Sequence, residues 1–165
     1  MAQRDHQLGW QGHFNIMAAD APTKVAAPAA VQAEQPVPVA TPVHIIPLIG
    51  EMWPEHGGIY AGMVRAEGDM PQHHVILLTA EPSKRMTWQE AMDWAASIGG
   101  ELPTRSEGAL LYANARELFE QSAWYWLAPQ HGGSCAWYQN FYGGNQNSSN
   151  RNGKGCARAV RRLVL

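Results

Sequence analysis

The chain has 165 residues and a formal net charge of −2, and 45% of its residues are hydrophobic, which is enough for a packed core. This length allows one compact domain with a tail. The sequence has no excess of basic residues, so we expect no nucleic-acid partner. It has no apolar run of about 18 residues, so we expect no insertion into a membrane. The charged residues 1–10 precede no apolar stretch of the secretory-signal type, which favours synthesis in a cytoplasm.

The first part of the chain differs in composition from the rest. Residues 18–47 are rich in Ala, Pro, Val and Gln. Because proline has a fixed φ and no amide donor, this stretch predicts an extended linker and no helix or central strand. At about 3.1 Å per residue, the linker would reach on the order of 90 Å. The compact domain is predicted to occupy residues 48–165.

Residues 1–17 precede the linker and are interpreted as an anchoring peptide. Their large apolar residues are Trp10, Phe14, Ile16 and Met17. Apolar side chains at the far end of a spacer favour docking onto another protein. The alternative is an ordinary chain terminus in which these residues are incidental.

The predicted domain begins with a β-hairpin and a helix. Residues 58–65 and 73–78 have the composition of strands and are joined by a polar connection. Thr87 and Glu90 have the spacing of a capping box, which predicts the start of a helix. Gly99 and Gly100 predict its end, because glycine readily adopts the left-handed conformation. The apolar residues at helical spacing are Trp88, Ala91, Met92, Ala95 and Ile98.

A second helix and several short strands are predicted to follow. Thr104 or Ser106 caps this helix, Thr104 and Glu107 form another capping box, and the helix reaches about Phe119. Short β segments are expected over residues 124–127, 135–141 and 157–163. A polar loop of Gly, Asn and Ser over residues 143–155 separates the last two.

These elements and the motifs between them resemble a known domain family. The motifs are Gly-Gly-x-Leu-Pro-Thr-Arg at 99–105, Tyr-Trp at 125–126, Ala-Trp-x-Gln-x-Phe at 136–141 and an Arg-rich segment at 157–162. In this order they resemble a family of unknown function found in phages and prophages. That family is similar to C-type lectins, to the variable proteins of diversity-generating retroelements and to formylglycine-generating enzymes. The resemblance covers roughly residues 49–163.

The resemblance implies both a fold and a function. It implies an α+β, C-type-lectin-like domain in which two helices pack on small twisted antiparallel sheets, with the C-terminal strand returning beside the N-terminal region. It further implies a bacteriophage virion protein that is made in the bacterial host. Together with the anchoring interpretation of residues 1–17, this predicts attachment to the capsid or tail through the N-terminal arm. We expect a homo-oligomer, with a trimer favoured. The alternatives are a tail-fibre or tail-tip protein that recognises a host glycan or protein and, less favoured, a formylglycine-generating-type oxidase.

The same resemblance places a candidate ligand surface just before the Arg-rich segment. The candidate residues are Trp137, Tyr138, Asn140, Tyr142, Asn145, Asn147, Asn150 and Asn152. Aromatic rings provide rigid contact area and amides provide adaptable hydrogen bonds, a combination that suits a sugar or a protein receptor. The alternative is an ordinary structural loop, since Asn, Gly and Ser are common in turns.

Other residues that could carry chemistry are expected to be structural. Trp88, Trp94, Trp124 and Trp126 are expected in the core. The adjacent His73 and His74 point to opposite faces of a strand and are poorly placed to chelate a metal. The arginines of the last segment are expected to be solvated or to form ion pairs with Glu101 or Glu107. They are Arg158, Arg161 and Arg162, and the alternative is that they bind an acidic partner. Cys135 and Cys156 are free thiols or form one bridge.

No catalytic residue, metal site or cofactor is expected. Calcium-dependent lectins of this fold use Glu-Pro-Asn and Trp-Asn-Asp tripeptides, and neither occurs here. The loop over residues 143–155 contains no carboxylate, which calcium usually requires. No activated nucleophile or general base stands out in the sequence, so we expect a protein that is not an enzyme.

Overall fold

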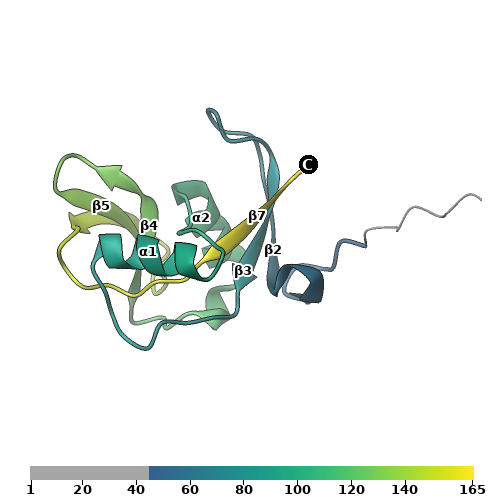
Figure 1. Ribbon diagram of the computed structural model, residues 1–165, viewed down its shortest axis with the longest axis horizontal. Coiled ribbons are helices and arrows are strands. Elements are labelled where there is room, and N and C mark those ends of the chain that lie inside the picture. Colours follow the sequence, from purple (N-terminus) through teal and green to yellow (C-terminus); the bar gives the residue numbers. More distant parts are fainter. Residues whose placement is uncertain (1–44) are drawn as a thin grey trace, which may run out of the picture. The chain divides into compact units, whose positions relative to one another are not determined.

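Two antiparallel sheets and two α-helices make up residues 45–165, the part of the chain that the computed structural model describes (Figure 1). The predicted α+β class is therefore confirmed. The proposed anchoring residues Trp10, Phe14, Ile16 and Met17 lie outside the described residues, as does the linker up to residue 44.

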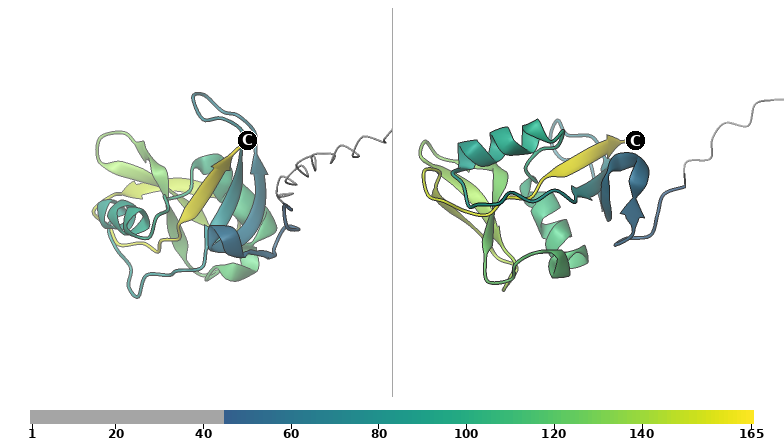
Figure 2. Two further views of the ribbon diagram at one scale, coloured as in Figure 1. Left: turned by 45° about the vertical axis from the view of Figure 1, so that its right-hand side comes forward. Right: turned by 60° about the horizontal axis from the view of Figure 1, so that its bottom comes forward.

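The first sheet combines strands from the beginning of the domain with the last strand. Its order is β1 (Met52–Trp53), β2 (Gly58–Val64), β3 (His73–Leu78) and β7 (Val160–Val164), and all neighbours are antiparallel. The short 3-10 helix η1 (Pro54–His56) connects β1 to β2. The predicted hairpin is confirmed as the β2–β3 pair. The last strand begins at Val160 and not at Ala157 as predicted, and it closes the sheet beside β3 (Figure 2).

The second sheet consists of β4 (Trp124–His131), β5 (Cys135–Asn140) and β6 (Gln146–Asn150), in that order. The prediction of a polar loop over all of 143–155 was wrong, because β6 lies within it. The sequence of β6, Gln-Asn-Ser-Ser-Asn, has no apolar residue and therefore no alternating pattern to recognise. It pairs with β5 through its backbone at the edge of the sheet. β4 is also longer than the predicted 124–127 segment and passes through a register irregularity after Trp126.

Both α-helices begin at the predicted capping boxes. The Thr87 hydroxyl accepts from the Glu90 amide ahead of α1 (Trp88–Ser97), and the Glu90 carboxylate accepts from the Thr87 amide at 2.8 Å. Thr104, and not Ser106, caps α2 (Arg105–Asn114) in the same way. Gly99 ends the first helical segment with a φ of 73°, as predicted. No helix within residues 45–165 is both long and apolar enough to cross a membrane.

The second helix is shorter than predicted. It ends at Asn114, because Ala115 leaves the helical conformation with a φ of −145°, and a 3-10 turn, η2 (Arg116–Leu118), follows. This break brings Phe119 into the core, where its ring stacks on Phe141 with centroids 3.8 Å apart. Packing of one aromatic residue therefore outweighs continuation of the helix, a preference that local spacing does not contain.

The second sheet carries one helix on each face. Leu111 of α2 shares a buried cluster with Tyr125 of β4, whereas Trp88 of α1 shares another with Trp126 of β4. Tyr125 and Trp126 are neighbours in sequence, so their side chains point to opposite faces of the strand. Two indoles donate to backbone carbonyls: Trp88 Nε1 to Leu127 O and Trp126 Nε1 to Met86 O, both at 2.9 Å. Both tryptophans are thus core residues, as predicted, and Trp94 and Trp124 pack partly buried against the same cluster.

Candidate functional site

The predicted ligand residues lie on both faces of the second sheet. Tyr138 pairs with Asn147 and shares the face of Trp126, whereas Trp137 pairs with Ser148 on the opposite face. The register places Asn140 on the face of Tyr138 and Asn150 on the face of Trp137. Tyr142 lies in the turn after β5, Asn145 just before β6 and Asn152 in the turn after it. The structure therefore does not bring all eight residues to one surface.

Three of the predicted asparagines accept hydrogen bonds from nearby backbone amides, Asn140 and Asn150 in turns and Asn147 within β6. Asn140 Oδ1 accepts from the Tyr142 amide at 2.8 Å and from the Gly143 amide at 3.2 Å. Asn147 Oδ1 accepts from the Ser148 amide at 2.8 Å. Asn150 Oδ1 accepts from the Asn152 amide at 2.9 Å. These local bonds are the ordinary reason for asparagine in turns, so they favour a structural role for these oxygens.

The aromatic members of the predicted surface differ in exposure. Tyr138 is half-buried, with its ring 5.0 Å from Trp124. Trp137 is also half-buried, because the Arg105 guanidinium lies 3.8 Å above its ring. Tyr142 is 76% exposed. Tyr142 is therefore the predicted aromatic residue best placed to meet a macromolecular partner.

The arginines of the C-terminal segment form ion pairs and backbone contacts within the domain. Arg162 pairs with both Glu101 and Glu107, as one of the two predictions for it stated. Arg161 donates to the carbonyl oxygens of His56 and Gly99. These two arginines therefore fasten the last strand to residues far away in the sequence.

Glu107 lies at the centre of a buried network. Its carboxylate accepts from Arg162 Nε at 2.6 Å and from the Thr104 amide at 2.7 Å, and it lies 2.8 Å from His73 Nε2. Burial would raise the pKa of Glu107, but the hydrogen bonds and charge of Arg162 outweigh it, so this pKa lies below that of an ordinary glutamate. The second histidine, His74, contacts the Tyr60 hydroxyl through Nδ1 at 2.8 Å. Both histidines are therefore buried and contact side chains of the domain, which agrees with the structural role expected for them.

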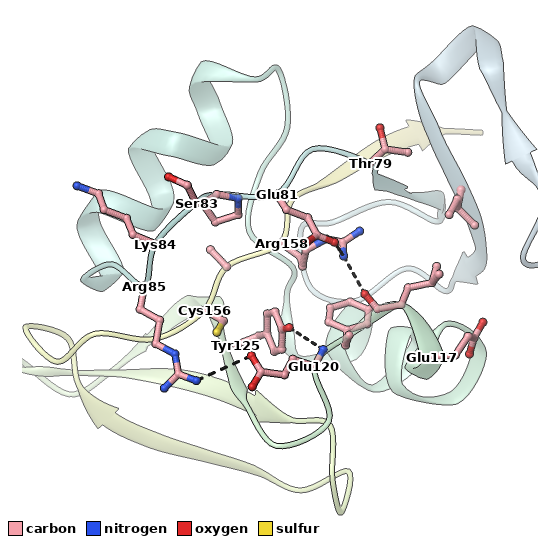
Figure 3. A pocket seen from close by; sticks show the side chains of 15 residues that line it. Thr79, Glu81, Ser83, Lys84, Arg85, Glu117, Glu120, Tyr125, Cys156 and Arg158 are labelled. Carbon is pink, nitrogen blue, oxygen red and sulfur yellow. Dashed lines mark hydrogen bonds and ion pairs between the residues drawn. The ribbon is translucent and has the colours of Figure 1, made fainter.

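A cleft of about 600 Å³, which the sequence did not predict, shares no lining residue with this network (Figure 3). It is lined by Ile59, by residues of the irregular segment 79–85, by the segment 117–120, by Tyr125 and by the segment 156–158. Its charged lining residues are Glu81, Lys84, Arg85, Glu117, Glu120 and Arg158. Because five separate stretches build it, no local motif could reveal it. The one available signal in the sequence was Arg158, a charged residue between two small apolar ones, Ala157 and Ala159. The structure shows that both alanines are buried.

Arg158 is the most buried charged residue of the cleft. It is 5% exposed, donates to Leu118 O at 2.8 Å and to Leu78 O at 3.2 Å, and pairs with the carboxylate of Glu81. Its Nε has no hydrogen-bond partner among residues 45–165. Burial lowers the pKa of the Arg158 guanidinium, and the Glu81 carboxylate opposes this shift. The ionic partner of the guanidinium is therefore the Glu81 carboxylate, which lines the cleft.

Two other polar groups face the same cleft (Figure 3). The Tyr125 hydroxyl accepts from the Glu120 amide at 2.9 Å, which leaves its own proton for another acceptor. Burial raises the pKa of Tyr125, so the hydroxyl stays protonated at neutral pH. Cys156 lines the cleft, and burial raises the pKa of its thiol. Cys135 lies on β5, and both cysteines are free, which is the unbridged form of the two alternatives.

Comparisons with known proteins give no family assignment. No protein-family model matches the sequence. No curated protein matches it either.

Proposed function

We propose that this chain is a bacteriophage virion protein in which residues 48–165 form a C-type-lectin-like binding module. Residues 1–17 are its anchor, residues 18–47 are its linker, and other virion proteins are its partners. The proposal assigns the protein no catalytic step, no cofactor and no nucleic-acid partner, and it takes the assembled form to be a homotrimer on the capsid or tail.

The strand order of the first sheet is the observation that carries this proposal. The early strands β1, β2 and β3 pair with the final strand β7, while the β4–β5–β6 sheet is built from the middle of the domain. The first described residues and Leu165 lie at one end of the domain, and β5 lies at the other (Figures 1 and 2). This arrangement agrees with the resemblance to lectin-like domains, and it suits a module that is attached at one end and binds at the other.

Deletion of residues 1–17 should abolish incorporation into particles. The deletion removes the large apolar residues Trp10, Phe14, Ile16 and Met17, which could bury surface against another virion protein. Immunoblotting of purified particles measures incorporation, and the thermal unfolding midpoint of the purified variant shows whether the domain still folds. Normal incorporation of the folded variant would reject the anchor.

The exposure of Tyr142 favours a second candidate, a tail-fibre or tail-tip protein that binds a host glycan or protein. In that case, Tyr142→Ala should slow adsorption to host cells by about tenfold, as expected for an exposed aromatic residue central to an interface. Met63→Ala in β2 is the matched control, because Met63 is 44% exposed and belongs to the other sheet. Particle yield should not change in either variant, and equal adsorption rates would argue against receptor binding through Tyr142.

A further inference from the structure

We propose that the cleft around Arg158 is a separate binding site for a small organic carboxylate that carries one negative charge. This inference does not depend on the proposed function, since the cleft shares no lining residue with the predicted ligand surface. Its volume of about 600 Å³ falls within the usual range of small-molecule sites, roughly 300–1,000 Å³. It is large enough for a monosaccharide acid or an amino acid.

The contacts of Arg158 indicate a carboxylate ligand. The guanidinium already binds one carboxylate, that of Glu81, at the wall of the cleft. The Glu81 side chain is 64% exposed and lies in a segment without regular structure. Breaking its ion pair with Arg158 therefore costs little free energy. Arg158, by contrast, is held in place by two backbone carbonyls. A ligand carboxylate could therefore replace Glu81 while Arg158 stays in position, because a guanidinium fork matches carboxylate geometry.

The remaining lining favours a single negative charge over several. Lys84, Arg85 and Arg158 contribute three positive charges, and Glu81, Glu117 and Glu120 contribute three negative charges. A balanced lining does not favour a phosphate group or a polyanion, which would meet the three carboxylates. When a ligand displaces Glu81, the buried Arg158 guanidinium needs one negative charge as its new partner, and a single carboxylate supplies it.

Tyr125 and the apolar walls suit the uncharged part of such a ligand. The Tyr125 hydroxyl has a proton to donate to a ligand hydroxyl or carbonyl oxygen. Ile59, Pro82 and Phe119 provide apolar surface in the same cleft. A carboxylate on a body of mixed polarity fits this lining better than a simple ion.

Calorimetric titration of the full chain with sodium glucuronate tests the site. We expect a dissociation constant on the order of 1 mM, as for a small ligand with few contacts. Glucose has a similar body without the charge and should not bind, and inorganic phosphate should bind more weakly than glucuronate. N-acetylalanine presents the carboxylate on an amino-acid body, and the tighter of the two carboxylates identifies the class of natural ligand. Failure of both carboxylates to bind, or equal binding of phosphate, would overturn the proposal.

Two matched variants test the role of Arg158 without altering it. Glu81→Gln removes the competing carboxylate and should tighten glucuronate binding by about threefold, the size expected for loss of a partly exposed ion pair. Glu117→Gln changes the lining charge by the same amount and should leave the affinity unchanged, because no contact joins Glu117 to the Arg158 guanidinium (Figure 3). Equal tightening in both variants would show a general charge effect and would overturn the assignment to Arg158.

A third variant alters Arg158 itself. Arg158→Gln should abolish glucuronate binding, provided that its unfolding midpoint shows a folded protein.

Discussion

Replacement of Glu107 by Gln should lower the free energy of unfolding by about 3 to 5 kcal/mol, the usual cost of removing one partner from a buried ion pair. Glu107 is fully buried and accepts hydrogen bonds from Arg162 and from the Thr104 amide. Glutamine keeps the shape but not the charge, so Arg162 would keep only Glu101, which lies at the surface, as an ionic partner. Urea unfolding of both proteins at pH 7 measures the difference.

Glu90→Gln is the matched control for this variant. Glu90 occupies the same capping-box position on α1 that Glu107 occupies on α2, and each carboxylate accepts from the amide of its capping threonine. Glu90 is exposed, so its replacement should cost only a small fraction of the loss at Glu107. Equal losses in the two variants would show that capping, and not the buried ion pair, makes Glu107 important.

The same network predicts how stability depends on pH. The pKa of Glu107 in the folded protein lies below that of an ordinary glutamate, so its carboxylate stabilises the fold at pH values above the unfolded-state pKa, about 4.3. This stabilisation is lost as the pH falls through the lower, folded-state pKa. We therefore expect the stability difference between wild type and Glu107→Gln to shrink as the pH is lowered from 7 to 3. A constant difference over that range would contradict the ion pair.

The contrast between Glu90 and Glu107 also shows what the sequence could and could not predict. Both capping boxes were predicted from four residues, because a cap is a local structure. The burial of only one of them was not predictable, since His73 and Arg162 lie 34 and 55 residues from Glu107 in the sequence. Local patterns likewise predicted the hairpin and the end of α1. The end of α2 depends on the stacking of Phe119 on Phe141, a tertiary contact.

The candidate site was predicted less well than the elements that hold it. Tyr138 and Asn140 lie on the strand that composition predicted, but Asn147 and Asn150 lie on β6 and not in the predicted loop. The faces of Asn147 and Asn150 could not be predicted, because the polar sequence of β6 gives no strand signal. The cleft around Arg158 was missed for a related reason, because its lining comes from segments far apart in the sequence, such as those of Ile59, Thr79 and Arg158.

Gly100→Ala should lower the free energy of unfolding by about 3 kcal/mol, near the upper end of the usual cost of overpacking. A Cβ atom at Gly100 would lie 2.6 Å from Leu78 Cδ1 and 2.9 Å from Val160 O. The Val160 carbonyl cannot easily move away, because it accepts from the Glu101 amide at 2.9 Å while the Val160 amide donates to Glu101 O at 2.8 Å. The added methyl group would therefore push β7 away from the end of α1.

The neighbouring glycine separates this packing effect from backbone conformation. Gly99→Ala places a side chain at a φ of 73° and should cost about 1 to 2 kcal/mol, the penalty of the left-handed region. Its Cβ would meet only the end of the flexible Arg161 side chain, at 3.2 Å. Gly133→Ala, where a Cβ meets nothing within 4 Å, should change the stability least. Chemical unfolding of the three variants should show the largest loss of unfolding free energy for Gly100→Ala, a smaller loss for Gly99→Ala and the smallest for Gly133→Ala. A larger loss of unfolding free energy in Gly99→Ala than in Gly100→Ala would contradict this. It would mean that the two glycines are needed for the turn after α1 and not for the close packing of Gly100 against β7.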